Sequence, residues 1–165
     1  MSVALIMGSD SDLERLGGCI DTLKQLEIPC DVRVLSAHRT PDDLAAYVRE
    51  VERDTAVFIC AAGGAAHLAG VVAAHTLRPV LGIPMDNPPL GGLDALLATV
   101  QMPGGVPVGA LGTGAGGPKN AALLAARILA VTDEHLRARL ERYRDEQAEA
   151  VRAKDARVRK KLGGD

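Results

Sequence analysis

The sequence is nearly devoid of aromatic residues. Its 165 residues include no tryptophan, one phenylalanine and two tyrosines, although 47% of the chain is hydrophobic. The core must therefore be built from Ala, Val, Leu and Ile, and 18 glycines allow its elements to approach closely. Single-stranded nucleic acids bind to aromatic platforms in basic grooves, and the formal charge of −2 adds no attraction to phosphate backbones. We therefore expect no nucleic-acid partner.

Cysteine is scarce as well. Cys19, Cys30 and Cys60 are odd in number, lack metal-ligand spacing and lie in apolar patterns. We interpret them as reduced core residues, which suits a cytoplasmic protein. No grouping of Cys, His and carboxylates has metal-binding spacing, so we predict no metal site. Residues 1–8 also lack the basic segment of a signal peptide.

Long hydrophobic runs are lacking, with one exception. Residues 56–74 are uncharged over a length that could span a membrane. The stretch is interrupted by Gly63-Gly64, contains His67, and is rich in Ala and Gly rather than Leu. It therefore predicts a buried strand, a tight turn and a buried helix, and not a membrane span.

Five short apolar segments alternate with helical patterns in residues 1–132. The predicted strands are 3–7, 30–35, 56–61, 78–84 and 106–111. The predicted helices are 13–26, one from Pro41, one through His67 to about 76, 93–100 and 121–130. This alternation is typical of a three-layer, doubly wound (flavodoxin-like) α/β fold with a five-stranded parallel sheet. Right-handed crossovers place helices on both faces, which explains strands that are apolar throughout.

Residues 133–165 form a helical extension of different character. Seventeen of the 40 charged residues lie between 133 and 161. Leu136, Leu140, Tyr143 and Val151 form a thin apolar stripe at roughly helical spacing, too narrow for a core helix. The helix is either solvated or packed on a neighbouring subunit. The stripe favours the second interpretation, and with it a homo-oligomer.

Polar and small residues gather where the predicted strands end. In an open parallel sheet, ligands bind outside the carboxyl ends of the strands. The residues there are Ser9, Ser11 and Asp12 after the first strand, His38 and Arg39 after the second, and Gly63, Gly64 and His67 after the third. The fourth and fifth strands lead into Pro- and Gly-rich loops, which we expect to offer backbone only.

The segment 8–12 begins a predicted helix, where free N–H groups and serine hydroxyls suit an anion. It matches neither a Walker A loop nor G-x-G-x-x-G, so neither ATP nor a dinucleotide is indicated. The carboxylate of Asp12 would repel phosphate but suits ribose hydroxyls. Helix capping by Ser9 and Asp12 is the alternative.

The pair His38-Arg39 has a more specific chemistry. Arginine binds phosphate or carboxylate through two parallel hydrogen bonds, and histidine exchanges a proton near neutral pH. The pair precedes Thr40-Pro41, where Thr40 is expected to cap a helix. We favour a functional role over a surface His–Arg pair, whereas His67 is either a core histidine or a second member of the site. Together these features predict an enzyme acting on a small phosphorylated substrate.

Five segments together resemble the N5-carboxyaminoimidazole ribonucleotide mutases, class I of the phosphoribosylaminoimidazole carboxylase catalytic subunit family. They are 7–12, 36–41, 62–68, 100–109 and 120–126, and the resemblance covers about residues 3–130. It implies transfer of a carboxylate from the N5 carbamate to C4 of the aminoimidazole ring, in de novo purine biosynthesis. In the reaction that the resemblance implies, released CO2 is recaptured in a closed pocket, without metal, ATP or organic cofactor. The resemblance also implies a homo-octamer with C-terminal helices crossing subunits.

The resemblance implies roles for individual residues of this chain. His38 would be the general acid/base that moves a proton between the leaving nitrogen and ring C4. The ribonucleotide monophosphate would be bound by Ser9, Ser11, Asp12 and Arg39, with Asp12 on the sugar hydroxyls. The backbone of Gly63, Gly64 and Ala65, together with His67, would line the pocket for the ring carboxylate and CO2.

Two alternatives remain. Relatives that carboxylate aminoimidazole ribonucleotide directly with CO2 share the Ser-Ala-His segment, but usually have Lys after this His and lack the Gly-Gly-Ala-Ala-His segment; Arg39 and His67 favour the mutases. A non-catalytic binding module on the same fold is the second alternative. Two departures from the family are Gly91, where Ser is usual, and Ala115, where many members have Lys.

Overall fold

The computed structural model describes residues 1–163, in which five strands form one parallel sheet. The strands are β1 (Ser2–Met7), β2 (Cys30–Val34), β3 (Thr55–Ala62), β4 (Val80–Pro84) and β5 (Gly109–Ala110). Their order is β2-β1-β3-β4-β5, and every neighbouring pair is parallel. The predicted flavodoxin-like, doubly wound sheet is thereby confirmed.

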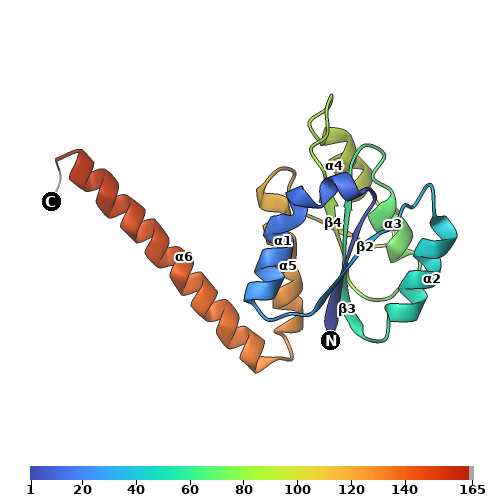
Figure 1. Ribbon diagram of the computed structural model, residues 1–165, viewed down its shortest axis with the longest axis horizontal. Helices are drawn as coiled ribbons and strands as arrows, with labels where there is room; N and C mark the ends of the chain where they lie inside the picture. Colours follow the sequence, from blue (N-terminus) through green and yellow to red (C-terminus); the bar gives the residue numbers. More distant parts are fainter. Residues whose placement is uncertain (164–165) are drawn as a thin grey trace.

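Helices cover both faces of the sheet (Figure 1). They are α1 (Gly17–Gln25), α2 (Pro41–Val51), α3 (Leu68–Ala73), α4 (Leu93–Val100) and α5 (Gly116–Leu129). Helices α1 and α5 pack together on one face, and α2 and α3 lie on the other (Figure 1). This three-layer arrangement is what right-handed crossovers require.

The two faces of the sheet carry separate hydrophobic cores. Leu5 and Ile59 belong to the core beneath α1 and α5, whereas Ile6 and Phe58 belong to the core beneath α2 and α3. All four are fully buried. Because successive side chains of a strand point to opposite faces, a strand covered on both sides must be apolar at every position.

Small residues bring the layers close together. At Gly82 in β4, an added Cβ would overlap Thr99 of α4 and contact Ala69 of α3. A core with few aromatic residues fills its volume by such close approach rather than by large side chains.

The start of α1 differs from the prediction. The helix begins at Gly17 instead of 13, and two 3-10 turns precede it, Asp10–Asp12 and Glu14–Leu16. The Ser9 hydroxyl accepts a hydrogen bond from the Ser11 N–H (3.3 Å). This side-chain acceptor caps the first 3-10 turn and competes with the regular α-helical pattern.

Three further boundaries were predicted wrongly. Strand β5 is two residues long rather than six, because Pro107 has no N–H to donate to a ladder. Helix α3 spans only Leu68–Ala73, since the preceding residues form a turn in which the His67 N–H donates to the Ala65 carbonyl (2.8 Å). Helix α5 begins at Gly116 rather than 121, because the first helical turn tolerates Pro118.

The uncharged stretch 56–74 contains most of β3 and all of α3, as the sequence predicted. Within residues 1–163, no helix has the length and apolar character needed to cross a membrane.

The last helix, α6 (Glu134–Lys161), extends away from the body of the protein (Figure 1). The buried side chains of Leu136 and Tyr143 anchor its N-terminal part. The Asp133 carboxylate caps the N-terminus of the helix by accepting a hydrogen bond from the Leu136 N–H (2.9 Å). In contrast, Val151 and Val158 are exposed. Only the first part of the predicted apolar stripe is therefore used within the chain.

Candidate active site

A cavity of about 200 Å³ lies at the carboxyl ends of β1, β2 and β3. Strand β1 lies between β2 and β3, so the strand order reverses direction at β1. The cavity therefore occupies the switch point of the sheet. Of the residues singled out in the sequence, it is lined by Ser9, Ser11, Asp12, His38, Arg39, Gly63, Ala65 and His67. Gly64 is not a lining residue; it turns the chain with a φ of 62°.

The loop after β1 brings two hydroxyls together beside a buried carboxylate. The Ser9 and Ser11 hydroxyl oxygens lie 2.7 Å apart, and Asp12 is 6% exposed. Burial raises the pKa of Asp12, and the Arg15 guanidinium, 3.7 Å away, opposes that rise. The loop thus offers hydroxyl donors and one carboxylate acceptor to a ligand.

The loop after β2 is closed by hydrogen bonds between Ser36 and Thr40. The Ser36 hydroxyl accepts from the N–H groups of His38 (3.3 Å) and Arg39 (3.1 Å). Thr40 is the N-cap residue of α2, as predicted, but its hydroxyl bonds the backbone of Ser36 rather than a helical N–H. The closed turn holds His38 and Arg39 at the cavity with both side chains exposed.

The two histidines meet across the cavity. His38 Nε2 and His67 Nδ1 are 2.8 Å apart, and the rings are perpendicular with centroids 4.9 Å apart. Both residues are exposed, so His67 is not a core histidine. One imidazole donates an N–H to the other in such a pair, so a hydrogen bond joins the two rings beside the cavity.

Arg39 provides the positive charge of the cavity. Among residues 1–163, no carboxylate lies within ion-pair distance of its guanidinium. An unpaired guanidinium at a cavity mouth suits a phosphate or carboxylate ligand.

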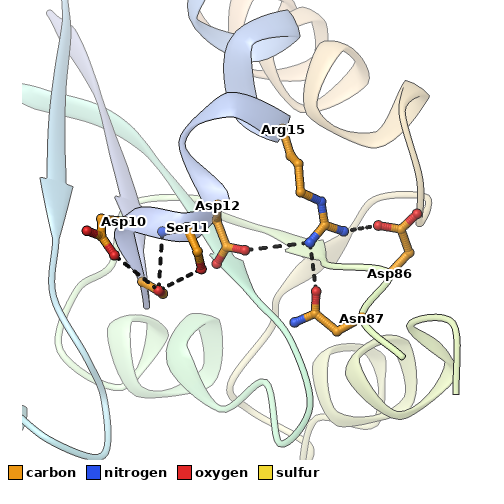
Figure 2. Close-up of polar contacts among 7 residues, drawn as sticks. Asp10, Ser11, Asp12, Arg15, Asp86 and Asn87 are labelled. Carbon is orange, nitrogen blue, oxygen red and sulfur yellow. Dashed lines mark hydrogen bonds and ion pairs between the residues drawn. The ribbon is translucent and has the colours of Figure 1, made fainter. Parts of the chain in front are cut away.

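The loop after β4 supplies a residue that sequence reasoning missed. We expected only backbone there, but the side chain of Asn87 lines the cavity. The Arg15 guanidinium donates to Asn87 Oδ1 (2.7 Å) and also pairs with Asp86 (Figure 2). The position of Asp86-Asn87, directly after a predicted strand end, was the available signal.

The three cysteines are free thiols, two of them buried. Burial raises the pKa of Cys19 to about 12 and that of Cys30 to about 11. Thiols with such pKa values stay protonated at neutral pH and are poor nucleophiles. The described residues, 1–163, contain no cluster of three metal-binding side chains.

A parallel sheet with a polar cavity at its switch point is the arrangement in which α/β proteins bind small ligands. The chain matches the AIR carboxylase family over residues 2–150. It belongs to that family, as the sequence segments predicted.

Two curated relatives of this chain are named as mutases, and a solved structure shares its fold. The N5-carboxyaminoimidazole ribonucleotide mutase of Mycobacterium leprae is 51% identical over 167 residues, covering 99% of this chain and 96% of that protein. The mutase of Brucella melitensis is 51% identical over 152 residues, covering 92% and 94%. The crystal structure of Treponema denticola PurE matches with a TM-score of 0.86 at 27% identity, covering 94% of this chain and 97% of that one.

Proposed function

We infer that this chain converts N5-carboxyaminoimidazole ribonucleotide to 4-carboxy-5-aminoimidazole ribonucleotide in purine biosynthesis. The chain shares half of its residues with named mutases along nearly its whole length. The observation that carries the mechanism is the contact between His38 and His67 at a small cavity that Arg39 also lines.

The reaction moves a carboxyl group within one molecule, so atoms balance without a co-substrate. In our proposal, the bond between N5 and the carboxyl carbon breaks, CO2 is released, and His38 gives a proton to the nitrogen. Ring C4 then attacks CO2, and His38 recovers a proton from C4. The hydrogen bond to His67 supports this role, because it orients the imidazole of His38 and offers a partner for its proton.

The same proposal assigns the remaining lining residues to binding. Arg39 takes the phosphate together with the hydroxyls of Ser9 and Ser11, and Asp12 takes the ribose hydroxyls. The backbone of Gly63 and Ala65 and the side chain of His67 surround the carboxyl group and CO2. The lining of the cavity supports this assignment, since all of these residues border one cavity of about 200 Å³ at the ends of β1, β2 and β3.

We also propose that the protein is a homo-oligomer, an octamer, in which α6 packs on a neighbouring subunit. The exposed Val151 and Val158 lie on the half of α6 that the chain itself leaves uncovered. Sedimentation of the full chain and of a variant ending at residue 147 tests this. We expect the shortened chain to form smaller assemblies; equal assemblies would contradict the role of α6.

An ultraviolet assay tests the activity. Purified protein is given N5-carboxyaminoimidazole ribonucleotide and, separately, aminoimidazole ribonucleotide with bicarbonate. We expect rapid conversion of the first, and slow conversion of the second except at very high bicarbonate. Efficient use of the second at modest CO2 would indicate a direct carboxylase, and binding without turnover of either would indicate a binding protein.

A further inference from the structure

We propose that Asn87 is a specificity-determining residue that donates a hydrogen bond to the carboxylate of the bound ribonucleotide, and that Arg15 positions its amide for this contact. The proposal deepens the proposed function and rests on it. Neither residue belongs to the segments that carry the family resemblance.

The orientation of the Asn87 amide follows from hydrogen-bond chemistry. Arg15 Nη1 lies 2.7 Å from Asn87 Oδ1. A guanidinium has only donors, so the carbonyl oxygen of the amide must face it and the NH2 group must face away. Figure 2 shows the amide nitrogen of Asn87 pointing away from Arg15.

The NH2 group lies in the wall of the cavity at Gly63. A Cβ added to Gly63 would overlap Asn87 Nδ2, so only glycine leaves space for the amide there. Asn87, Gly63 and His67 line the same cavity. In the proposed binding mode, Gly63, Ala65 and His67 surround the carboxyl group, and the amide of Asn87 therefore meets that end of the substrate.

Arg15 is itself fixed from two sides. Its guanidinium forms an ion pair with Asp86 and lies 3.7 Å from the buried carboxylate of Asp12 (Figure 2). The backbone N–H of Asn87 also donates to the carbonyl of Met85 (2.9 Å), which holds the loop. Two carboxylates balance the charge of Arg15, so it acts as a support for Asn87 rather than as a competing anion site.

The neutral amide of Asn87 suits a carboxyl group whose charge changes during the transfer. The carboxyl group is an anion in substrate and product but neutral as CO2. Hydrogen bonds from charged donors to anions are roughly twice as strong as those between neutral groups. An amide therefore binds the carboxylate in preference to CO2, but less strongly than a cation would. It leaves CO2 free to reach C4.

Calorimetric binding of two ligands tests the proposal without relying on turnover. One ligand is 4-carboxy-5-aminoimidazole ribonucleotide, and the other is aminoimidazole ribonucleotide, which lacks the carboxylate. For Asn87→Ala we expect about tenfold weaker binding of the first ligand and unchanged binding of the second. Asn87→Asp, which keeps the acceptor for Arg15 but adds a negative charge, should weaken the first ligand further. Equal effects on both ligands, or none, would overturn the proposal.

The positioning role of Arg15 needs a double-mutant cycle. Arg15→Met should reduce the ratio of the two affinities as much as Asn87→Ala does, and the double variant should reduce it no more than either single variant. The ratio is the measured quantity because Arg15 also lies 3.7 Å from Asp12, which would change the binding of both ligands. Arg49→Met, at an exposed position of α2, is the matched control and should bind both ligands normally. Additive losses would show that Arg15 does not act through Asn87. Turnover of the wild type, measured separately, distinguishes failure of this proposal from failure of the mutase activity.

Discussion

His38 Nε2 lies 2.8 Å from His67 Nδ1, although 29 positions separate the two residues in the chain. One histidine follows β2 and the other precedes α3, and the β1 strand lies between β2 and β3 in the sheet. The parallel arrangement brings both loops to the same edge, where the rings meet at 90°. This contact places two titratable groups at one cavity and is the basis of the first two predictions.

Replacing His38 with Asn should abolish most turnover but leave binding intact. Proton transfer by a positioned side chain contributes about 10²–10⁴-fold to a rate, so we expect kcat to fall by that factor while the Kd for the ribonucleotide changes little. His135→Asn, on an exposed position of α6, is the control and should be fully active. A His38→Asn variant with normal kcat would exclude His38 as the proton carrier.

Replacing His67 should act through the orientation of His38. For His67→Leu we expect kcat to drop by about 10–100-fold, because the partner of His38 Nε2 is lost and the ring is no longer held. The polar His67→Asn variant can restore a hydrogen bond and should recover part of the rate. The pH profile of kcat should change in the Leu variant; equal rates and profiles for both variants would contradict the role of this hydrogen bond.

Replacing Arg39 with Ala should mainly weaken substrate binding. An unpaired guanidinium at the cavity is expected to hold the phosphate, so KM should rise by about 10–100-fold with a smaller change in kcat. Steady-state kinetics measure both values, with Arg49→Ala as the control of equal charge change on α2. An unchanged KM would argue against the phosphate role.

Replacing Asp12 with Asn should stabilise the unliganded protein at neutral pH. Burial raises the pKa of Asp12 above its ordinary value. The folded protein therefore binds this proton more readily than the unfolded chain, and its stability falls as pH rises through the native pKa. Removing the charge should raise the melting temperature by a few degrees at pH 7.

The stability gain at Asp12 should depend on pH. It should shrink as pH falls below the native pKa of Asp12 towards the ordinary aspartate value, because the wild-type side chain is then protonated as well. Asp10→Asn, at an exposed position of the same turn, is the control. Thermal melts of the wild type and of Asp12→Asn at pH 7 and pH 4 test this. An equal gain in melting temperature at both pH values would contradict burial as the cause.

The fold class was readable from the sequence because its signals are local. Each buried strand appears as a short apolar run. The stretch 56–74 was distinguished from a membrane span by Gly63-Gly64, by His67 and by its Ala and Gly content. Boundaries were less well predicted, since they depend on single hydrogen bonds such as that between Ser9 and Ser11. The family resemblance rests on five short segments, which are local signals as well, and it was confirmed.

The sequence by itself determined the parallel sheet and the edge at which Ser9, His38 and His67 gather, because the carboxyl ends of parallel strands meet at one edge. Only the tertiary structure decided which side chains touch. Arg15 and Asn87 are 72 positions apart, and nothing in the local pattern of either predicts their hydrogen bond. Such contacts depend on how loops from different strands pack and on which rotamers that packing permits, and these are properties of the assembled fold.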